Sequence, residues 1–257
     1  MSVTIRFYAE LNDFLPYGLK NADIESAYDR RRSVKDLIEA CGIPHTEVDL
    51  IIVNGAARGF DHVLSDKDRV GVYPRFRSID ISALTNVRAE PLSKMRFVLD
   101  IHLGKLASYL RMLGFDTLYR NDYEDPELAR VSVEEKRMLL TRDHGLLKRC
   151  IVSHGYFVRE TDPMLQLAEI IGRFSLLESA APFARCLVCN GLLRPVEKSS
   201  ISQRLMPKTE KYYEEFFSCV ECGKIYWKGS HYTNMKKFIE AFFARSGASI
   251  EKKGIQA

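Results

Sequence analysis

Acidic residues recur where short apolar runs of the chain end. Asp100 closes RFVLD, Asp143 closes LLTRD and Asp162 closes FVRETD, while Asp122 and Asp125 lie in RNDYED, just after FDTLY. If these runs are parallel strands, their carboxyl ends meet along one edge of a sheet, where α/β proteins bind ligands. Converging carboxylates suit a hard divalent cation such as Mg²⁺ or Mn²⁺. The pattern therefore favours metal-dependent phosphoryl chemistry.

The same aspartates also fit a purely structural role. Asp125 and Asp162 each precede a proline, which is typical of a helix N-cap followed by proline at the first helical position. Asp143 precedes a short predicted helix, and Asp122 suits a turn. Asp100 is the hardest to explain as a cap, because it ends an apolar strand and leads into an apolar helix. Capping and catalysis both stay open on periodicity alone.

Four cysteines form two CxxC pairs with 29 residues between the pairs: Cys186, Cys189, Cys219 and Cys222. Paired CxxC spacing in a chain without a secretory signal predicts a zinc site rather than two disulfides. Four thiolates complete the tetrahedral shell of Zn²⁺ and leave no open position, so the site would be structural. The two other cysteines, Cys41 and Cys150, are expected to lie in the core.

The bulk composition is that of an ordinary globular protein, with 46% hydrophobic and 28% charged residues in 257. We find no apolar run of the ~18 residues that a membrane span needs and no signal peptide, so we expect a cytoplasmic protein. Residues 185–257 carry 13 Lys and Arg against 7 Asp and Glu. This basic part suits a polyanionic partner, although solvated surface explains the excess equally well.

The elements that must position these residues fall into several segments. Residues 1–78 predict a small α+β domain, because VTIRF alternates like a half-buried strand, SVKDLIEACG reads as a capped helix, and DLIIVNG and DRVGVYP read as strands. Residues 79–94 have no sustained period and predict a linker. Residues 95–180 alternate strands with helices, which argues for right-handed βαβ units and a parallel sheet. Residues 181–245 hold the cysteine knuckles, and 246–257 predict a flexible tail.

The middle and last segments together resemble a known nuclease family. RFVLDIHLGKLASYLRMLGFDTLY, RMLLTRDHGLL and YFVRETDP, followed by the two knuckles and WKGSHY, are similar in order to the Mut-seven C-terminal RNase domain. That family is similar to the PIN nucleases. The resemblance implies a PIN-like parallel α/β domain with a zinc ribbon, an RNA substrate, and catalysis with Mg²⁺ or Mn²⁺.

The resemblance also ranks the candidate site residues. Asp100, Asp125 and Asp143 match the acidic positions of the family best, and Asp122 and Asp162 match them more loosely. Two glutamates, Glu127 and Glu160, lie nearby as reserves. Lys105, one turn into the helix after Asp100, and Arg142 are expected either to meet a substrate phosphate or to be solvated surface cations. No histidine is required for this chemistry, and His102 and His144, which flank the acidic residues, are expected either to lie behind the ligands as supporting residues or to be on the surface.

The first segment resembles the ubiquitin-like β-grasp domains, including the small sulfur carriers. RFYAELNDFLP and VDLIIVNG…DRVGVYP carry this likeness. Sulfur carriers act through a free C-terminal Gly-Gly, whereas this chain continues through VYPRFRS, so the resemblance implies a docking or structural module and a protein partner for it.

The leading hypothesis from the sequence is a metal-dependent ribonuclease with a structural zinc ribbon. The alternative is an RNA-binding adaptor whose nuclease fold is weak or inactive and whose β-grasp domain docks a partner. A third hypothesis is a DNA-directed nuclease or a phosphatase that uses the same acidic site. Aromatic residues around the knuckles, such as Tyr212 and Trp227, are interleaved with lysines. The rings could stack RNA bases while the lysines hold phosphates, but a small ribbon core explains most of the aromatic residues.

Overall fold

The computed structural model describes the chain except for residues 29–30, 77–79, 82, 88 and 246–257. It divides into two compact units that interleave along the sequence. Unit 1 comprises Met1–Lys94 and Glu124–Phe157, and unit 2 comprises Met95–Tyr123 and Val158–Ala257. The domain boundaries expected from the sequence stay predictions, and the expected tail 246–257 lies outside the described residues.

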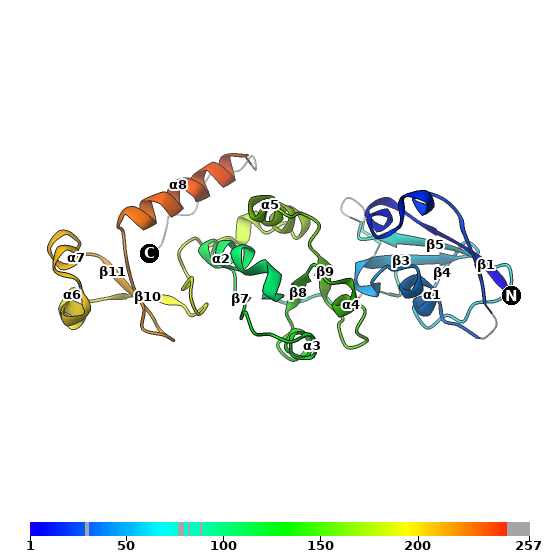
Figure 1. The fold of residues 1–257 in the computed structure, drawn as a ribbon, viewed down its shortest axis with the longest axis horizontal. Helices are drawn as coiled ribbons and strands as arrows, with labels where there is room; N and C mark the ends of the chain where they lie inside the picture. The colour runs from blue at the N-terminus through cyan, green and yellow to red at the C-terminus, as the bar shows by residue number, and fades with distance from the viewer. Residues whose placement is uncertain (29–30, 77–79, 82, 88, 246–257) are drawn as a thin grey trace. The chain divides into compact units, whose positions relative to one another are not determined.

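A five-stranded mixed sheet forms the first part of unit 1 (Figure 1). Its order is β2-β1-β5-β3-β4, with β1 parallel to β5 and the other pairs antiparallel. The strands are β1 (Ser2–Phe7), β2 (Ile24–Ala27), β3 (Val48–Val53), β4 (Ala56–Ala57) and β5 (Arg69–Pro74). A single α-helix, α1 (Val34–Ala40), and the 3-10 turns η1 (Ala9–Phe14), η2 (Tyr17–Leu19) and η3 (His45–Glu47) connect them. This arrangement confirms the predicted β-grasp fold.

The alternation in β1 decides which face of this sheet is buried. Val3, Ile5 and Phe7 are each at most 1% exposed and share one core with the buried side of α1. The intervening side chains lie on the opposite face. Ser33 starts α1 with a complete capping box, since its hydroxyl accepts from the Asp36 N–H while the Asp36 carboxylate accepts from the Ser33 N–H.

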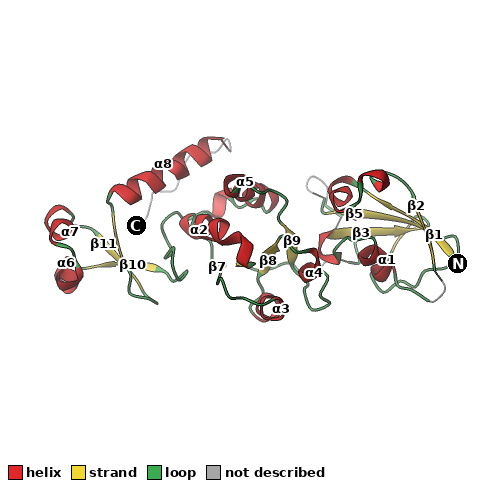
Figure 2. Ribbon diagram, in the orientation of Figure 1, coloured by secondary structure: helices red, strands yellow, loops and turns green. Residues whose placement is uncertain are grey.

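Two pairs of parallel strands, one in each unit, form the α/β part of the chain (Figure 2). In unit 2, β6 pairs with β7; in unit 1, β8 pairs with β9. The strands are β6 (Phe97–Leu99), β7 (Thr117–Leu118), β8 (Met138–Thr141) and β9 (Gly155–Phe157). All residues of β6 and β8 are buried, as expected where both faces of a parallel sheet are covered.

Helices alternate with these strands, which confirms the predicted βαβ pattern. They are η4 (Ile101–Leu103), α2 (Gly104–Met112), α3 (Asp125–Glu134), α4 (His144–Leu147), α5 (Pro163–Arg173) and η5 (Leu177–Ser179). The described helices include none that combines the length and apolarity needed to cross a membrane.

The end of unit 2 is a small antiparallel sheet followed by a long helix. Its elements are β10 (Leu193–Val196), α6 (Lys198–Ile201), η6 (Ser202–Arg204), α7 (Pro207–Tyr212), β11 (Phe216–Cys219), β12 (Ile225–Trp227) and α8 (Ser230–Arg245). Two aromatic contacts join α8 to the rest of the unit: Phe238 lies against Tyr109, and Tyr232 against Phe183, with ring centroids 4.7 and 4.5 Å apart.

Two expectations about side-chain placement need correction or qualification. Cys150 is exposed, so its predicted place in the core is wrong: α4 ends at Leu147, and the turn that follows directs Cys150 outward while Leu146 and Leu147 stay buried. The linker expected over residues 79–94 stays a prediction, and two of its described residues have contacts of their own. Ile81 is only 4% exposed, and the Thr85 hydroxyl donates to the carbonyl of Asp49.

Candidate functional site

Three of the predicted site residues cap a helix, and two of them also lie at a strand end, whereas Asp162 lies five residues after the end of β9. Asp100 directly follows β6, and its Oδ1 accepts from the His102 N–H at 3.3 Å. Asp143 follows β8 by two residues and accepts from the Gly145 N–H at 2.6 Å. Asp162 caps α5, accepting from the N–H groups of Met164 and Leu165. The structural role weighed from the sequence is therefore real for these aspartates, and a cap uses only part of a carboxylate's capacity to accept.

Burial separates Asp100 from the other candidates. Its residue is 6% exposed, whereas Asp143 and Asp162 lie on the surface. Removing an ionised carboxylate from water is costly unless cations or hydrogen-bond donors compensate. A buried carboxylate at the end of a parallel strand lies where α/β folds bind ligands, so the position of Asp100 suits a ligand-binding role as well as a cap.

Asp122 and Asp125 differ from each other in a way that the sequence did not resolve. Asp122 is held by Arg120, whose Nε and Nη2 donate to its two oxygens at 2.9 and 3.2 Å, and this hydrogen bond lowers the pKa of Asp122. Asp125 is the first residue of α3 rather than its N-cap, which is Glu124. Its carboxylate therefore interacts with the helix dipole, with Arg149 Nη2 at 3.9 Å.

The candidates are distributed over both units of the fold. Asp125 and Asp143 belong to unit 1, and Asp100, Asp122, Asp162 and Lys105 belong to unit 2. The convergence of Asp100, Asp125 and Asp143 on one cation stays a prediction. Lys105 is an exposed residue in the first turn of α2, and its Nζ lies 5.6 Å from the ring centroid of Tyr109.

The four cysteines of the two knuckles do come together. Their sulfur atoms lie within 4.8 Å of one another, with Cys186 to Cys222 at 3.7 Å and Cys189 to Cys219 at 3.3 Å. Disulfide sulfurs would be ~2.05 Å apart, so these are thiols. Ligands about 2.3 Å from a tetrahedral zinc ion place their sulfurs roughly 3.8 Å apart. The donor set and its spacing therefore fit Zn²⁺.

The protonation of this cluster shows why a cation suits it. Burial opposes ionisation of Cys186, but donors including the Tyr226 hydroxyl, 3.1 Å from its sulfur, bring the pKa of that thiol down to about 6. Burial and the neighbouring sulfurs instead raise the pKa of Cys189 to about 12. Burial and neighbouring sulfurs thus oppose a charged sulfur at Cys189. A bound divalent ion would compensate that charge.

A buried arginine that the sequence analysis missed supports the first knuckle. Arg111 in α2 is 4% exposed, and its Nη1 donates to the carbonyls of Leu187 and Val188 at 3.1 and 2.9 Å. Its Nε donates to the carbonyl of Thr117 at 2.9 Å. Burial lowers the pKa of Arg111, and the cysteine sulfurs oppose that shift. The only signal in the sequence was a lone cation within the apolar helix LASYLRMLG.

Asn190 fixes the same knuckle from the other side. It adopts a left-handed backbone conformation with φ of 73°, which asparagine tolerates. Its side-chain oxygen accepts from the Thr117 N–H at 2.9 Å, and its Nδ2 donates to Asp116 at 2.8 Å. The loop between the first two cysteines is therefore anchored to α2 and β7 by outer groups of the kind that orient metal ligands.

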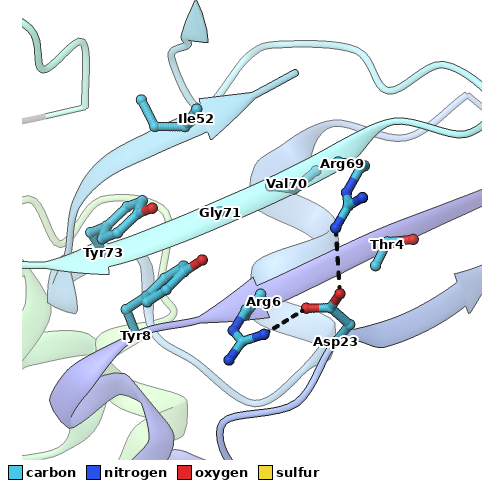
Figure 3. Close-up of a pocket in the computed structure, with 9 residues that line it drawn as sticks. All are labelled: Thr4, Arg6, Tyr8, Asp23, Ile52, Arg69, Val70, Gly71 and Tyr73. Carbon is cyan, nitrogen blue, oxygen red and sulfur yellow. Dashed lines mark hydrogen bonds and ion pairs between the residues drawn. The ribbon is translucent and has the colours of Figure 1, made fainter. Parts of the chain in front are cut away.

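A pocket on the outer face of the β-grasp sheet is lined by charged and aromatic side chains (Figure 3). Arg6 and Arg69 both bind the Asp23 carboxylate, at 3.2 and 3.5 Å. The rings of Tyr8 and Tyr73 stack beside them with centroids 4.3 Å apart. Arg6 and Arg69 therefore share the Asp23 carboxylate. The residues that line this pocket include neither a knuckle cysteine nor a predicted catalytic aspartate.

Comparison with known proteins yields two family matches along the chain. The model of the family described as "Mut7-C RNAse domain" matches residues 95–239, and that described as "Mut7-C ubiquitin" matches residues 1–80. Among solved structures, SAMP1 from Haloferax volcanii is similar at 16% identity, covering 30% of this chain and 97% of that protein, with a TM-score of 0.24. No curated protein matches the chain significantly.

Proposed function

The chain belongs to the Mut7-C RNase domain family, and from that premise we propose that it hydrolyses RNA phosphodiester bonds with the help of a divalent cation. Family membership supports a nuclease-like function. The finer proposal, divalent-cation catalysis, rests on the burial of Asp100. Its carboxylate is 6% exposed at the carboxyl end of β6, the kind of position where parallel α/β folds bind ligands.

The proposed ligands of the cation are Asp100, Asp125 and Asp143. Their carboxylate oxygens are the donors that Mg²⁺ and Mn²⁺ prefer. Asp122 and Asp162 are weaker candidates, because Arg120 holds the first and two main-chain N–H groups hold the second. A cation bound by these carboxylates would neutralise phosphate charge and promote ionisation of an attacking water.

The chain's own cations would orient the substrate. Lys105 lies in the first turn of α2, five residues after Asp100, and its ammonium group lies over the Tyr109 ring. We propose that it contacts a phosphate oxygen of the RNA as a point charge. Arg142, between the end of β8 and Asp143, is a second candidate for the same role.

The second proposed metal is a structural zinc ion held by the four knuckle cysteines. The sulfur spacing supports this assignment, and the anchoring of the first knuckle by Arg111 and Asn190 fits a rigid structural site. With all four cysteines bound there is no open coordination position, so the zinc takes no part in hydrolysis. Its contribution is to the folding of the ribbon.

One observation favours the alternative, an RNA-binding adaptor without hydrolysis. Asp143 and Asp162 both act as helix N-caps, which explains their presence without any chemistry. In that case the ubiquitin-like module would recruit a protein partner, while the basic ribbon held RNA. The two proposals differ in a single measurable property, which is turnover.

Cleavage assays on the purified full-length chain test the proposal. We expect cleavage of single-stranded RNA with Mn²⁺ or Mg²⁺, loss of cleavage with EDTA, and loss of cleavage in Asp100→Asn at any Mn²⁺ concentration. Glu134→Gln is the matched control, because it also removes one carboxylate charge, but from an exposed surface ion pair. Duplex RNA, single-stranded DNA and a phosphomonoester complete the panel.

Three results would contradict the proposal. RNA binding without turnover in every metal would establish the adaptor. Cleavage of DNA or of the phosphomonoester in preference to RNA would establish the third hypothesis. Full activity in Asp100→Asn would show that the buried carboxylate is not part of the chemistry.

A further inference from the structure

Three aromatic rings meet beside Asp143, and one of them comes from the ubiquitin-like module. His144, the residue after Asp143, lies against Phe157 with ring centroids 4.3 Å apart and against Phe14 at 5.0 Å. Phe14 and Phe157 are themselves 5.4 Å apart, and all three pairs are edge-to-face. Phe14 ends η1 and also packs on the core of the β-grasp sheet. The Phe14 side chain therefore connects the ring of His144 to that core.

The helix that Asp143 caps is too short to be stable without tertiary contacts. α4 has only four residues, and a helix of one turn is unstable in isolation because nucleation costs more than its few hydrogen bonds return. Its N-terminal geometry must come from outside contacts. The Asp143 Oδ1 accepts from the Gly145 N–H, so the direction of the carboxylate depends on that geometry. The ring of His144, the first residue of α4, supplies one such contact.

Hydrogen bonds also connect the ubiquitin-like module to residues 148–157, which belong to the same unit. The Phe157 N–H, on the last strand of its sheet, donates to the Glu47 carboxylate at 2.7 Å. His45 lies with Nε2 2.8 Å from the Val152 carbonyl and Nδ1 2.7 Å from the Glu39 carboxylate. The Lys148 ammonium donates to the Glu39 carbonyl at 3.0 Å.

The polar groups of this contact are buried. Glu47 is 2% exposed and His45 is 8% exposed, although both are polar and titratable. Both ring nitrogens of His45 face oxygen atoms, those of the Glu39 carboxylate and the Val152 carbonyl. Separation of the module from the segment would deprive these groups of partners that the docked arrangement provides, and a buried polar group that loses its partner is costly.

We propose that the ubiquitin-like module is a positioning element of the nuclease: Phe14 fixes the ring of His144 and thereby orients the Asp143 carboxylate. The functional half of this inference rests on the proposed function, because it takes Asp143 as a cation ligand. The structural half, that Phe14 controls the cap of α4, does not. Phe14 and His144 are positioning residues and do not touch the substrate.

A mutant cycle in the full-length chain tests the inference. The variants are Phe14→Ala, His144→Ala and the double variant, with Tyr17→Ala as the control because Tyr17 is an aromatic residue of the same region that is 93% exposed. The first readout is hydrogen exchange of the Gly145 amide, which the Asp143 cap protects. The second is the Mn²⁺ concentration that gives half-maximal RNA cleavage.

Each single variant should accelerate exchange at Gly145 and raise the half-saturating Mn²⁺ concentration. An edge-to-face ring pair corresponds to roughly 2- to 10-fold, and each variant removes two such pairs. The double variant should be no worse than the more affected single variant, because Phe14 acts through His144. Tyr17→Ala should match the unmodified chain. A merely destabilised protein would instead lose maximal rate with an unchanged Mn²⁺ dependence.

Several outcomes would overturn the inference. They are wild-type exchange at Gly145 in folded Phe14→Ala, single effects that multiply in the double variant, or faster exchange with an unchanged Mn²⁺ dependence. If Phe14→Ala does not fold, Phe14→Leu retains apolar packing while removing the ring, and it replaces Phe14→Ala in the cycle. If the unmodified chain cleaves no RNA, the proposed function fails, and the exchange data still decide whether Phe14 positions the cap.

Discussion

Replacement of Arg111 by methionine should weaken zinc-coupled folding of the ribbon, although Arg111 itself lies in α2. Methionine keeps an apolar stem of similar length but removes every donor and the positive charge. The carbonyls of Leu187 and Val188, next to the first two cysteines, lose their partner, as does the carbonyl of Thr117. The knuckle would still be held to Thr117 and Asp116 by Asn190, and to Gly114 and Asp116 by Arg185.

The size of the effect follows from the shortest of these bonds. A hydrogen bond from a charged donor contributes about 1.5–3 kcal/mol, and bonds from one group are not additive. If only the two bonds at 2.9 Å count, at the lower end of that range, the loss is about 3 kcal/mol. Since ~1.4 kcal/mol is tenfold in an equilibrium constant, zinc-coupled folding should weaken on the order of 100-fold.

The assay is zinc release to a colorimetric chelator across a urea series, starting from protein that contains one zinc per chain. Arg111→Met should release its zinc at lower urea, and Arg111→Lys should behave similarly because a single ammonium cannot reach separate carbonyls as a guanidinium does. Arg130→Met is the matched control, since Arg130 is exposed and pairs with Glu134 on the surface. The reasoning fails if Arg111→Met loses less than about 1 kcal/mol, or no more than Arg130→Met.

Two further predictions concern the nuclease segment. Asp143→Asn retains an oxygen that can cap α4, so it should keep the thermal stability of the unmodified chain within ~0.5 kcal/mol and yet reduce Mn²⁺-dependent RNA cleavage by at least about 100-fold; Asp143→Ala should lose a further ~1 kcal/mol of stability, and an Asn variant with normal cleavage would show that Asp143 is only a cap. Gly114→Ala should destabilise unit 2 by at least about 2 kcal/mol in urea unfolding, because residue 114 has φ of 90° and its added Cβ would lie 2.0 Å from the Ala181 carbonyl oxygen. Gly18→Ala, where no atom lies within 4 Å of the added Cβ, should stay within ~0.5 kcal/mol and serves as its control.

Local patterns predicted those parts of the structure that neighbouring residues determine. The alternation in VTIRF specified the buried face of β1, Ser33 specified the start of α1, and the CxxC spacing specified the sulfur cluster. Each of these depends on periodicity, on a cap, or on metal-ligand spacing. The prediction for α3 was off by one residue, since a helix that begins at Asp125 rather than after it differs only in which carbonyl makes the first bond.

Contacts between distant residues could not be predicted in this way. His45 reaches the carbonyl of Val152, 107 positions along the chain, and Glu47 accepts from the N–H of Phe157, 110 positions away. A histidine or glutamate near an apolar strand has no periodic signature that names such a partner. The same limit applies to the candidate site, because a strand-end aspartate that caps a helix and one that binds a cation have the same sequence pattern.

The interleaving of the two units has a consequence for how the chain is made. Unit 1 is complete only when residues 124–157 have left the ribosome, although its β-grasp core lies within the first 94 residues. The module can therefore collapse early, but Glu47 must wait for Phe157 to be synthesised. A gene fragment that begins at residue 95 would encode β9 without Glu47, whose carboxylate accepts from the Phe157 N–H. Residues 1–94 and 124–157 therefore need to be expressed together, even though two separate family models match the two parts of the chain.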